Sequence, residues 1–175
     1  MKSEGRSPKS ISHGPAIIAL GSNLGDSRQT ILAAVARLQS FSNGPVLKSS
    51  LWQTAPVDCP PGSSKFVNAV VGIEPFADET PESLLEKLRE IEREFGRQSK
   101  MVLNEPRPLD LDLIAFGNEV RKSPELTLPH PRAHLRRFVL QPLSEIGPDL
   151  VLPGQGKTVK ELLTELSADE IVTLI

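Results

Sequence analysis

Short runs of β-branched and apolar residues alternate with amphipathic helical stripes, and this alternation limits the folds open to the chain more than any other feature. Residues 16–20, AIIAL, are followed by Gly-Ser-Asn, which predicts a buried strand that ends in a turn. Asp26 is a candidate helix cap. Apolar residues follow it at helical spacing: Ile31, Leu32, Val35 and Leu38. Asn-Gly-Pro at residues 43–45 is expected to end this helix.

The best-marked helix lies between Thr80 and Gly96. Thr-Pro-Glu-Ser at residues 80–83 is typical of a helix start, and Gly96 is typical of a helix end. The expected buried stripe consists of Leu84, Leu85, Leu88, Ile91 and Phe95. Strands are predicted at residues 46–54, 66–74 and 109–116, and shorter helices at 137–146 and 158–166. The pattern predicts an α/β or α+β sandwich in which helices cover a sheet.

The chain of 175 residues is long enough for one domain with a sizeable core, which we assign to residues 15–175. Residues 1–14 are rich in Ser, Gly, Lys and Pro and are expected to form a flexible tail. A formal net charge of -2 gives no general reason to expect nucleic acid as a partner. No apolar run approaches the roughly 20 residues that cross a bilayer, so no membrane association is expected. Because Cys59 is the only cysteine, an internal disulfide is excluded, and we expect a reducing, cytoplasmic location. A monomer is expected, although the sequence alone does not fix the oligomeric state.

Two acids interrupt an otherwise apolar strand in the segment PRPLDLDLIAFG, residues 106–117. Because side chains alternate along a strand, Asp110 and Asp112 are expected on one face with their backbones roughly 6.6 Å apart, while the leucines between them face the core. Like charges this close repel unless a cation lies between them, and carboxylate oxygens suit Mg²⁺, which also binds substrate phosphates. The pair predicts a magnesium-nucleotide site, and a solvated sheet face is the alternative for this motif taken alone.

Basic residues flank or follow these acids in the sequence. They are Arg97, Lys100, Arg107, Arg132, Arg136 and Arg137. Guanidinium groups bind phosphate oxygens in bidentate geometry, so this group beside paired acids favours phosphoryl transfer, although any one of them alone is more simply a solvated surface side chain. A P-loop kinase is disfavoured, because Gly-Ser-Asn-Leu-Gly at residues 21–25 lacks the Gly-Lys-Ser/Thr ending.

A histidine, two aromatic rings and an amide are further candidates. His130 lies between two prolines, which restrict the backbone and can hold the imidazole in one direction. Only 4% of the chain is aromatic, which makes Phe66 and Phe138 candidates for packing a flat heterocycle. Asn68 follows Phe66 on the same strand face, where its amide can donate to and accept from a heterocycle edge. A loop position for the histidine and core packing for each ring are the alternatives.

Four segments, in order, resemble the 6-hydroxymethyl-7,8-dihydropterin pyrophosphokinase family. They are IALGSNLGD (18–26), FVNAVVGIE (66–74), PRPLDLDLIAFG (106–117) and LTLPHPRAHLRRFVLQPLSEIGP (126–148). The resemblance implies a ferredoxin-like sandwich with helices packed on a mainly antiparallel sheet. It also implies an enzyme that binds ATP, two Mg²⁺ ions and 6-hydroxymethyl-7,8-dihydropterin. Such an enzyme transfers pyrophosphate to the hydroxymethyl group and releases AMP, a step of folate biosynthesis.

The resemblance also implies roles for single residues. Asp110 and Asp112 resemble the metal-bridging carboxylates, and with them Arg97 and Arg107 are the expected catalytic residues. Nucleotide contacts are implied for Glu92, Arg97, Lys100, Arg107, His130 and Arg136. Pterin contacts are implied for Thr54, Pro56, Val57, Phe66, Asn68 and Phe138. Of these, Phe66 and Phe138 resemble the pair of rings that encloses the pterin.

Residues 96–107, GRQSKMVLNEPR, depart from the family pattern, which often reads Gly-Arg-x-Arg and then Arg-Trp-Gly-Pro-Arg. Ser99, Leu103 and Asn104 are the mismatches, so two cations and an indole are missing, while Lys100 can replace one charge. A catalytically lapsed relative that still binds pterin or nucleotide is therefore the alternative to the enzyme. An RNA-binding module is a third reading, because ferredoxin-like sheets also carry that function, but the net charge of -2 and the lack of tyrosine count against it.

Overall fold

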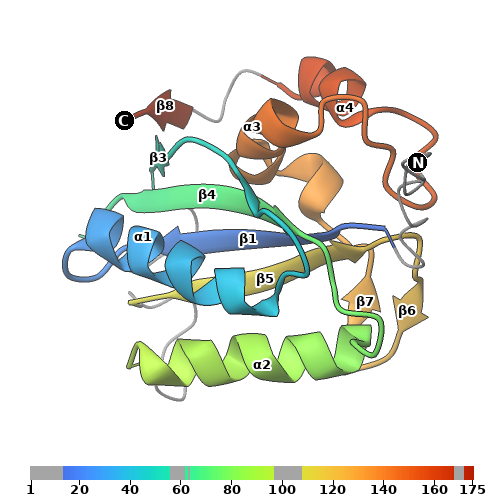
Figure 1. Cartoon of the computed structure of the whole chain (residues 1–175). Helices are drawn as coiled ribbons and strands as arrows, with labels where there is room; N and C mark the ends of the chain where they lie inside the picture. Colours follow the sequence, from blue (N-terminus) through green and yellow to red (C-terminus); the bar gives the residue numbers. More distant parts are fainter. Residues whose placement is uncertain (1–13, 56–61, 63, 97–107, 168–171) are drawn as a thin grey trace, which may run out of the picture.

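A sheet separates two layers of helices in the computed structural model, which describes residues 14–55, 62, 64–96, 108–167 and 172–175 (Figure 1). The α-helices are α1 (Ser27–Leu38), α2 (Pro81–Glu94), α3 (Arg137–Ile146) and α4 (Val159–Glu165). The strands are β1 (Ala16–Ser22), β2 (Leu47–Lys48), β3 (Trp52–Thr54), β4 (Phe66–Ile73), β5 (Asp110–Phe116), β6 (Arg121–Lys122), β7 (Thr127–Leu128) and β8 (Val172–Leu174). Two short 3-10 helices are η1 (Gln39–Phe41) and η2 (Ala133–Leu135).

The strands of the main sheet run in the order β5-β1-β4-β3-β8, with β2 also paired to β4. All of these pairings are antiparallel. The connection through α1 leads from β1 toward β2 and β3, and the connection through α2 leads from β4 to β5 on the far side of β1 (Figure 1). With β2 and β3 together as the second strand, this is the βαββαβ order of a ferredoxin-like sandwich. The fold class predicted from the sequence is confirmed.

Strand β1 is buried along its whole length because each of its faces meets a different core. Ile18 and Leu20 pack with the apolar side chains of α1 and α2. Ile17 and Ala19 pack with those of α3 and α4 on the other face. A strand covered on both faces reads as a continuous apolar run, which is why residues 16–20 show no polar alternation.

The starts of the first two helices follow the predicted caps. The Asp26 carboxylate accepts a hydrogen bond from the Gln29 N–H at 3.2 Å. Thr80 and Ser83 form a reciprocal capping box at the start of α2, with the Ser83 N–H donating to the Thr80 hydroxyl at 3.1 Å. On α1 the buried side consists of Ile31, Ala34 and Leu38, whereas Leu32 is 47% exposed.

The strand predicted at residues 46–54 is interrupted. The Ser49 hydroxyl accepts a hydrogen bond from the Val70 N–H at 2.9 Å, in place of a backbone carbonyl. The register then moves by one residue, from Lys48 opposite Val71 to Trp52 opposite Asn68. An extra residue of this kind is a β-bulge, and it divides the segment into β2 and β3.

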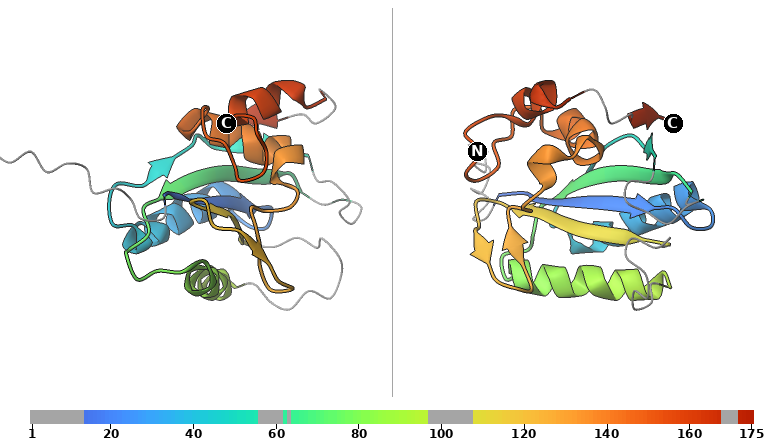
Figure 2. Two further views of the ribbon diagram at one scale, coloured as in Figure 1. Left: turned by 90° about the vertical axis from the view of Figure 1, so that its right-hand side faces the viewer. Right: turned by 180° about the vertical axis from the view of Figure 1, so that it is seen from behind.

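Three short strands were not predicted from the sequence. β6 and β7 form a hairpin beside one end of α2, where the Arg121 guanidinium lies 2.5 Å from the Glu82 carboxylate (Figure 2). β8 extends the main sheet by pairing with β3. Residues 1–13 of the expected tail lie outside the described residues. None of the helices described combines the length and low polarity that a membrane span requires.

Candidate functional site

The two acids of β5 lie on the sheet face that α3 and α4 cover. Asp110 and Asp112 are half-buried, whereas Leu111 between them is buried in the core formed with α1 and α2. This is the alternation predicted from the sequence. In the pairing with β1, Asp112 lies opposite Ala19 and Asp110 lies opposite Gly21. The acids are therefore at the end of the sheet where β1 leads into α1.

Gly21 occupies the centre of a row that crosses three strands. It pairs with Asp110 on β5 and with Asn68 on β4, so these positions share one face of the sheet. A Cβ atom added at Gly21 would lie 3.4 Å from Asn68 Oδ1 and 3.7 Å from Phe66 Cδ1. The glycine thus leaves space between an amide and an aromatic ring on one side and a carboxylate on the other.

A hydrogen bond fixes the amide of this row. The buried Asn68 donates from Nδ2 to the Thr54 hydroxyl at 2.9 Å, and Thr54 is itself buried on β3. With Nδ2 held there, Oδ1 turns toward Gly21. Phe66 pairs with Thr54 and is half-buried at the edge of the same face. The structure therefore brings Thr54, Phe66 and Asn68 together, while Pro56 and Val57 lie outside the described residues.

Backbone groups of two other residues hold His130 in one orientation. Its N–H donates to the Ile114 carbonyl of β5 at 2.8 Å, and its Nδ1 accepts from the Arg132 N–H at 3.2 Å. An Nδ1 that accepts carries no proton, so the neutral ring donates through Nε2. Burial lowers the pKa of His130, the positive charges of Arg136 and Arg132 lower it further, and Asp110 opposes them. Because its pKa is lowered from 6.5, the imidazole is neutral at about pH 7.

Arg136 and Phe138 contact each other where α3 begins. The Arg136 guanidinium lies over the Phe138 ring, 5.4 Å from its centre. A cation over a ring face is attracted to the aromatic quadrupole. Phe138 is half-buried and packs against the core of α3 and α4. By contrast, Arg137 donates to the carbonyls of Leu166 and Ser167 beyond the end of α4, so it joins two structural elements.

Glu92 reaches the same strand from the other layer. It lies on α2, is 7% exposed, and accepts the Leu111 N–H at 3.0 Å. Leu111 pairs with Leu20 of β1, and its N–H points away from that strand toward the open edge of β5. The carboxylate of Glu92 therefore holds the backbone between Asp110 and Asp112.

Several predicted site residues fall outside the described residues. They are Arg97, Lys100 and Arg107, together with the mismatched Ser99, Leu103 and Asn104. Among the residues that are described, no group of three or more His, Cys, Asp or Glu side chains is arranged to hold a metal ion. A cation here would rely on Asp110, Asp112 and oxygen atoms of a ligand or water. Two carboxylates with substrate phosphates are a common environment for Mg²⁺, so the acids fit that ion.

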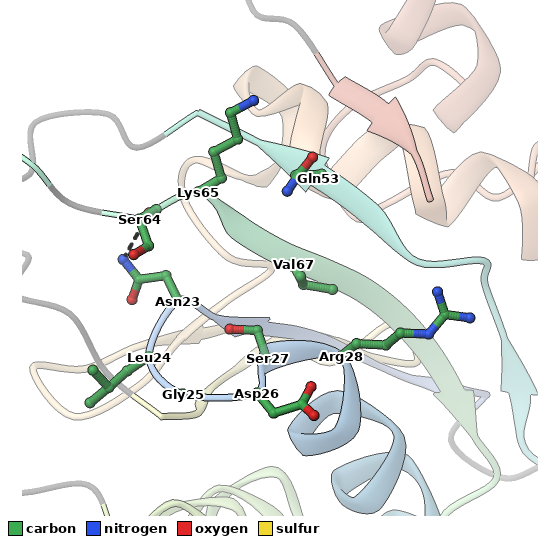
Figure 3. Close-up of a pocket in the computed structure, with 10 residues that line it drawn as sticks. All are labelled: Asn23, Leu24, Gly25, Asp26, Ser27, Arg28, Gln53, Ser64, Lys65 and Val67. Atoms are coloured by element: carbon green, nitrogen blue, oxygen red, sulfur yellow. Dashed lines mark hydrogen bonds between the residues drawn. The ribbon is translucent and has the colours of Figure 1, made fainter.

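A pocket of about 540 Å³ opens on the opposite face of the sheet, at the start of α1 (Figure 3). Val67 on its floor belongs to the core with α1 and α2, and none of the predicted site residues lines it. Asn23 closes one side by donating from Nδ2 to the Ser64 carbonyl at 3.3 Å. The charged ends of Arg28 and Lys65 point away from one another. The pocket offers no converging charges and is not the site that the sequence predicted.

The sequence did not predict that Gly21 lies on this face of β1, between the candidate site residues. A glycine inside an apolar strand is a known sign of close approach by a ligand or another backbone. The interpretation of Gly21 as part of a turn hid that sign. The buried contact of Glu92 with a backbone N–H was also not predicted, because helical spacing alone does not identify the strand that faces a helix.

Comparisons with known proteins show what the chain as a whole is similar to. The sequence model of the family described as 7,8-dihydro-6-hydroxymethylpterin-pyrophosphokinase matches residues 17–148. The 2-amino-4-hydroxy-6-hydroxymethyldihydropteridine pyrophosphokinase of Haemophilus influenzae is 38% identical over 91% of this chain and 97% of its own length. The protein of the same name from Bacillus subtilis is 41% identical over 75% of this chain and 77% of its own length.

A solved structure supports the fold. The crystal structure of wild-type Plasmodium falciparum HPPK-DHPS with pteroate aligns with a TM-score of 0.66 at 15% identity. The alignment covers 87% of this chain and 42% of the Plasmodium chain. At this identity, the likeness concerns the arrangement of helices and strands alone.

Proposed function

This chain belongs to the 7,8-dihydro-6-hydroxymethylpterin-pyrophosphokinase family, and we propose that the side chains gathered on the α3 face of its sheet perform the family's reaction. The chain is an enzyme that transfers pyrophosphate from ATP to the hydroxymethyl group of 6-hydroxymethyl-7,8-dihydropterin, in folate biosynthesis. The described residues give no indication of catalytic lapse. Family membership also favours the enzyme over the RNA-binding reading.

The observation that carries this placement is the row from Asn68 through Gly21 to Asp110. Two strand spacings separate its ends, which is roughly 10 Å between backbones. A bicyclic pterin with its hydroxymethyl arm has a comparable length. Asn68 would therefore form hydrogen bonds with the edge of the pterin, and the hydroxymethyl group of the pterin would point toward Asp110. Gly21 would leave room beneath the ring.

The pterin would be held by groups that the fold has already oriented. Asn68 Oδ1 can accept from the ring edge because Nδ2 is occupied by Thr54. Phe66 on β4 and Phe138 on α3 would lie against the two faces of the heterocycle. The residues Pro56 and Val57 are proposed to complete this wall.

ATP and two Mg²⁺ ions are proposed on the side of the acids. Asp110 and Asp112 would bind the ions, which when bound supply charge neutralisation for the phosphate oxygens. His130 would donate from Nε2 to the nucleotide as a neutral group. Arg136, which lies over the Phe138 ring, would contact phosphate. Contacts from Glu92, Arg97, Lys100 and Arg107 to the nucleotide complete the proposed set.

The proposed reaction forms one bond and breaks one. The hydroxymethyl oxygen attacks the β-phosphorus of ATP in line, the bond from that phosphorus to the α-phosphate oxygen breaks, and AMP leaves. The hydroxyl proton is lost to solvent or to a carboxylate such as Asp110. No covalent intermediate with the protein is needed, so its contribution is alignment of the two substrates. We also propose that the enzyme acts as a monomer, and that it acts in the cytoplasm, a reducing compartment with which the single cysteine agrees.

The test is AMP release from ATP and Mg²⁺, with and without 6-hydroxymethyl-7,8-dihydropterin. We expect pterin-dependent AMP in the wild type. Asp112→Asn should lower the rate by at least about a hundredfold, because it removes a metal-binding charge worth several kcal/mol in the transition state. Asp78→Asn, which changes an exposed acid in the turn before α2, is the matched control and should retain the wild-type rate.

Each result has a distinct meaning. Near-normal turnover by Asp112→Asn would contradict the metal assignment. Pterin binding by the wild type without AMP would instead identify a lapsed relative. Circular dichroism of each variant separates loss of activity from loss of fold.

A further inference from the structure

We infer that Glu145 is a positioning residue for the pterin slot, because it ties the helix that carries Phe138 to the strand that carries Thr54. Glu145 lies near the end of α3, on its exposed side and away from the reacting groups. The inference rests on the proposed function, since it assumes that Phe138 and Thr54 belong to the pterin site.

One carboxylate receives three donors from one short segment. Trp52 Nε1 donates to Glu145 Oε1 at 2.6 Å, and the Ser50 hydroxyl donates to Oε2 at 2.7 Å. The Ser50 N–H adds contacts of 3.2 and 3.4 Å to the same two oxygens. Hydrogen bonds to a charged acceptor are shorter and stronger than neutral ones, and a carboxylate bound at both oxygens is fixed in direction.

The donors lie at the β-bulge that starts β3. Trp52 pairs with Asn68, and Thr54, two residues later on the same strand, accepts the hydrogen bond from the Asn68 amide. The place of Trp52 along the strand therefore sets the place of the residues that face the pterin edge. Ser50 belongs to the bulge itself, so its contacts hold the irregular part of the strand.

Glu145 itself belongs to α3, the helix that also carries Phe138. Phe138 precedes Glu145 by about two helical turns, or roughly 10 Å along α3. The apolar contacts of Val139, Leu140 and Leu143 bury this helix on the sheet, but such contacts are non-directional. The carboxylate adds the directional contact that sets where α3 stands along β3, and so sets the separation of Phe138 from Thr54 and Asn68.

A surface tie that only stabilises the fold is the competing explanation, and affinities distinguish the two. If Glu145 positions the slot, its removal weakens pterin binding far more than ATP binding, because Arg136 alone of the proposed nucleotide contacts lies at the start of α3. If it only stabilises the fold, both affinities change together or neither changes. The measurement is the Kd of each substrate by calorimetry, with α,β-methylene-ATP as the non-reacting nucleotide.

We expect Glu145→Ala to raise the pterin Kd by about tenfold, as the loss of one charged hydrogen-bond acceptor would give, and to change the nucleotide Kd by less than about twofold. Glu145→Gln keeps one acceptor oxygen and should restore part of the affinity. Trp52→Phe keeps a ring but removes the indole donor and should give an intermediate pterin Kd. Glu165→Ala, which breaks the exposed ion pair with Lys157, is the matched control and should change neither.

An unchanged pterin Kd in Glu145→Ala, or equal losses for pterin and nucleotide, would overturn the inference while leaving the proposed function in place. If Glu145→Ala does not fold, the same criteria apply to Trp52→Phe. Failure of the wild type to bind pterin would overturn the proposed function and this inference with it. A pterin-selective loss that Glu145→Gln partly reverses is the supporting result.

Discussion

Gly21 is the residue at which a single added methyl group tests the site. The contacts of 3.4 Å and 3.7 Å that a Cβ atom would make are ordinary van der Waals distances, so Gly21→Ala should fold. The methyl group would nevertheless occupy the space between Asn68 and Asp110. We expect the pterin Kd to rise by at least about tenfold, which corresponds to about 1.4 kcal/mol. Thermal unfolding and calorimetry check the two parts, and an unchanged Kd would place the pterin elsewhere.

His130 gives a prediction about pH. Burial and the charges of Arg136 and Arg132 lower its pKa from the ordinary value of 6.5. Between the native pKa and 6.5 the unfolded chain therefore binds more protons than the native protein, so stability rises with pH across this window. We expect the free energy of unfolding to fall as the pH drops below 6.5, and His130→Gln to lessen that fall. Denaturant unfolding at several pH values measures this, and an NMR titration of the imidazole above 6.5 would refute it.

For single residues, the sequence correctly predicted the features that depend only on neighbouring positions in the chain. The shared face of Asp110 and Asp112 follows from strand alternation, and the caps at Asp26 and Thr80 follow from residue type. The orientation of Asn68 and the tautomer of His130 did not follow, because each depends on a partner brought in by folding or by a local backbone turn.

Among the elements, α2 and β5 share an apolar core and also a buried hydrogen bond from the Leu111 N–H to Glu92, which two variants of Glu92 can test. Glu92→Gln keeps an oxygen that accepts the Leu111 N–H, so stability should be nearly retained. Glu92→Ala leaves that N–H without this acceptor and should lower stability by about 1–3 kcal/mol. Urea unfolding of both variants compares them. Equal stability of the two would show that the hydrogen bond contributes little.

Elements were predicted well where a long periodic pattern sets them. The 14 residues of α2 carry a capping box and a continuous apolar stripe, and both are present. The bulge within residues 46–54 was missed because it depends on the Ser49 hydroxyl meeting Val70, which is distant in sequence. The two-residue strands β6 and β7 and the exposed strand β8 have too few residues to show a period.

For the molecule as a whole, two cores on the two faces of one sheet should have different relations to function. Leu38 and Leu143 are both completely buried, in the cores of α1 and α3 respectively. Replacing either by alanine should cost about 2–5 kcal/mol of stability. Only Leu143→Ala should also weaken pterin binding, because α3 carries Phe138. Chemical denaturation and pterin calorimetry test this pair, and equal pterin affinities would contradict it.

The whole-molecule fold was predictable because the three longest strands, β1, β4 and β5, carry apolar runs. The alternation of strands and helices fixed a sandwich, and resemblance supplied the ferredoxin-like order. The sequence did not predict which face of the sheet carries the candidate site residues. That depends on α3 and α4, which cover the face of β1 that α1 and α2 leave open. The proposed site lies on the face that these two helices cover.

The contact between Glu92 and the Leu111 N–H also bears on how molecules of this chain meet one another. In the part of the chain that the structure describes, β5 is the last strand on its side of the sheet. The free N–H groups of such a strand can recruit a strand from a second molecule and begin aggregation. At Leu111 that donor is occupied by a charged side chain from the same molecule. Glu92, which holds the backbone between Asp110 and Asp112, therefore also hinders the pairing of β5 with a strand of a second molecule.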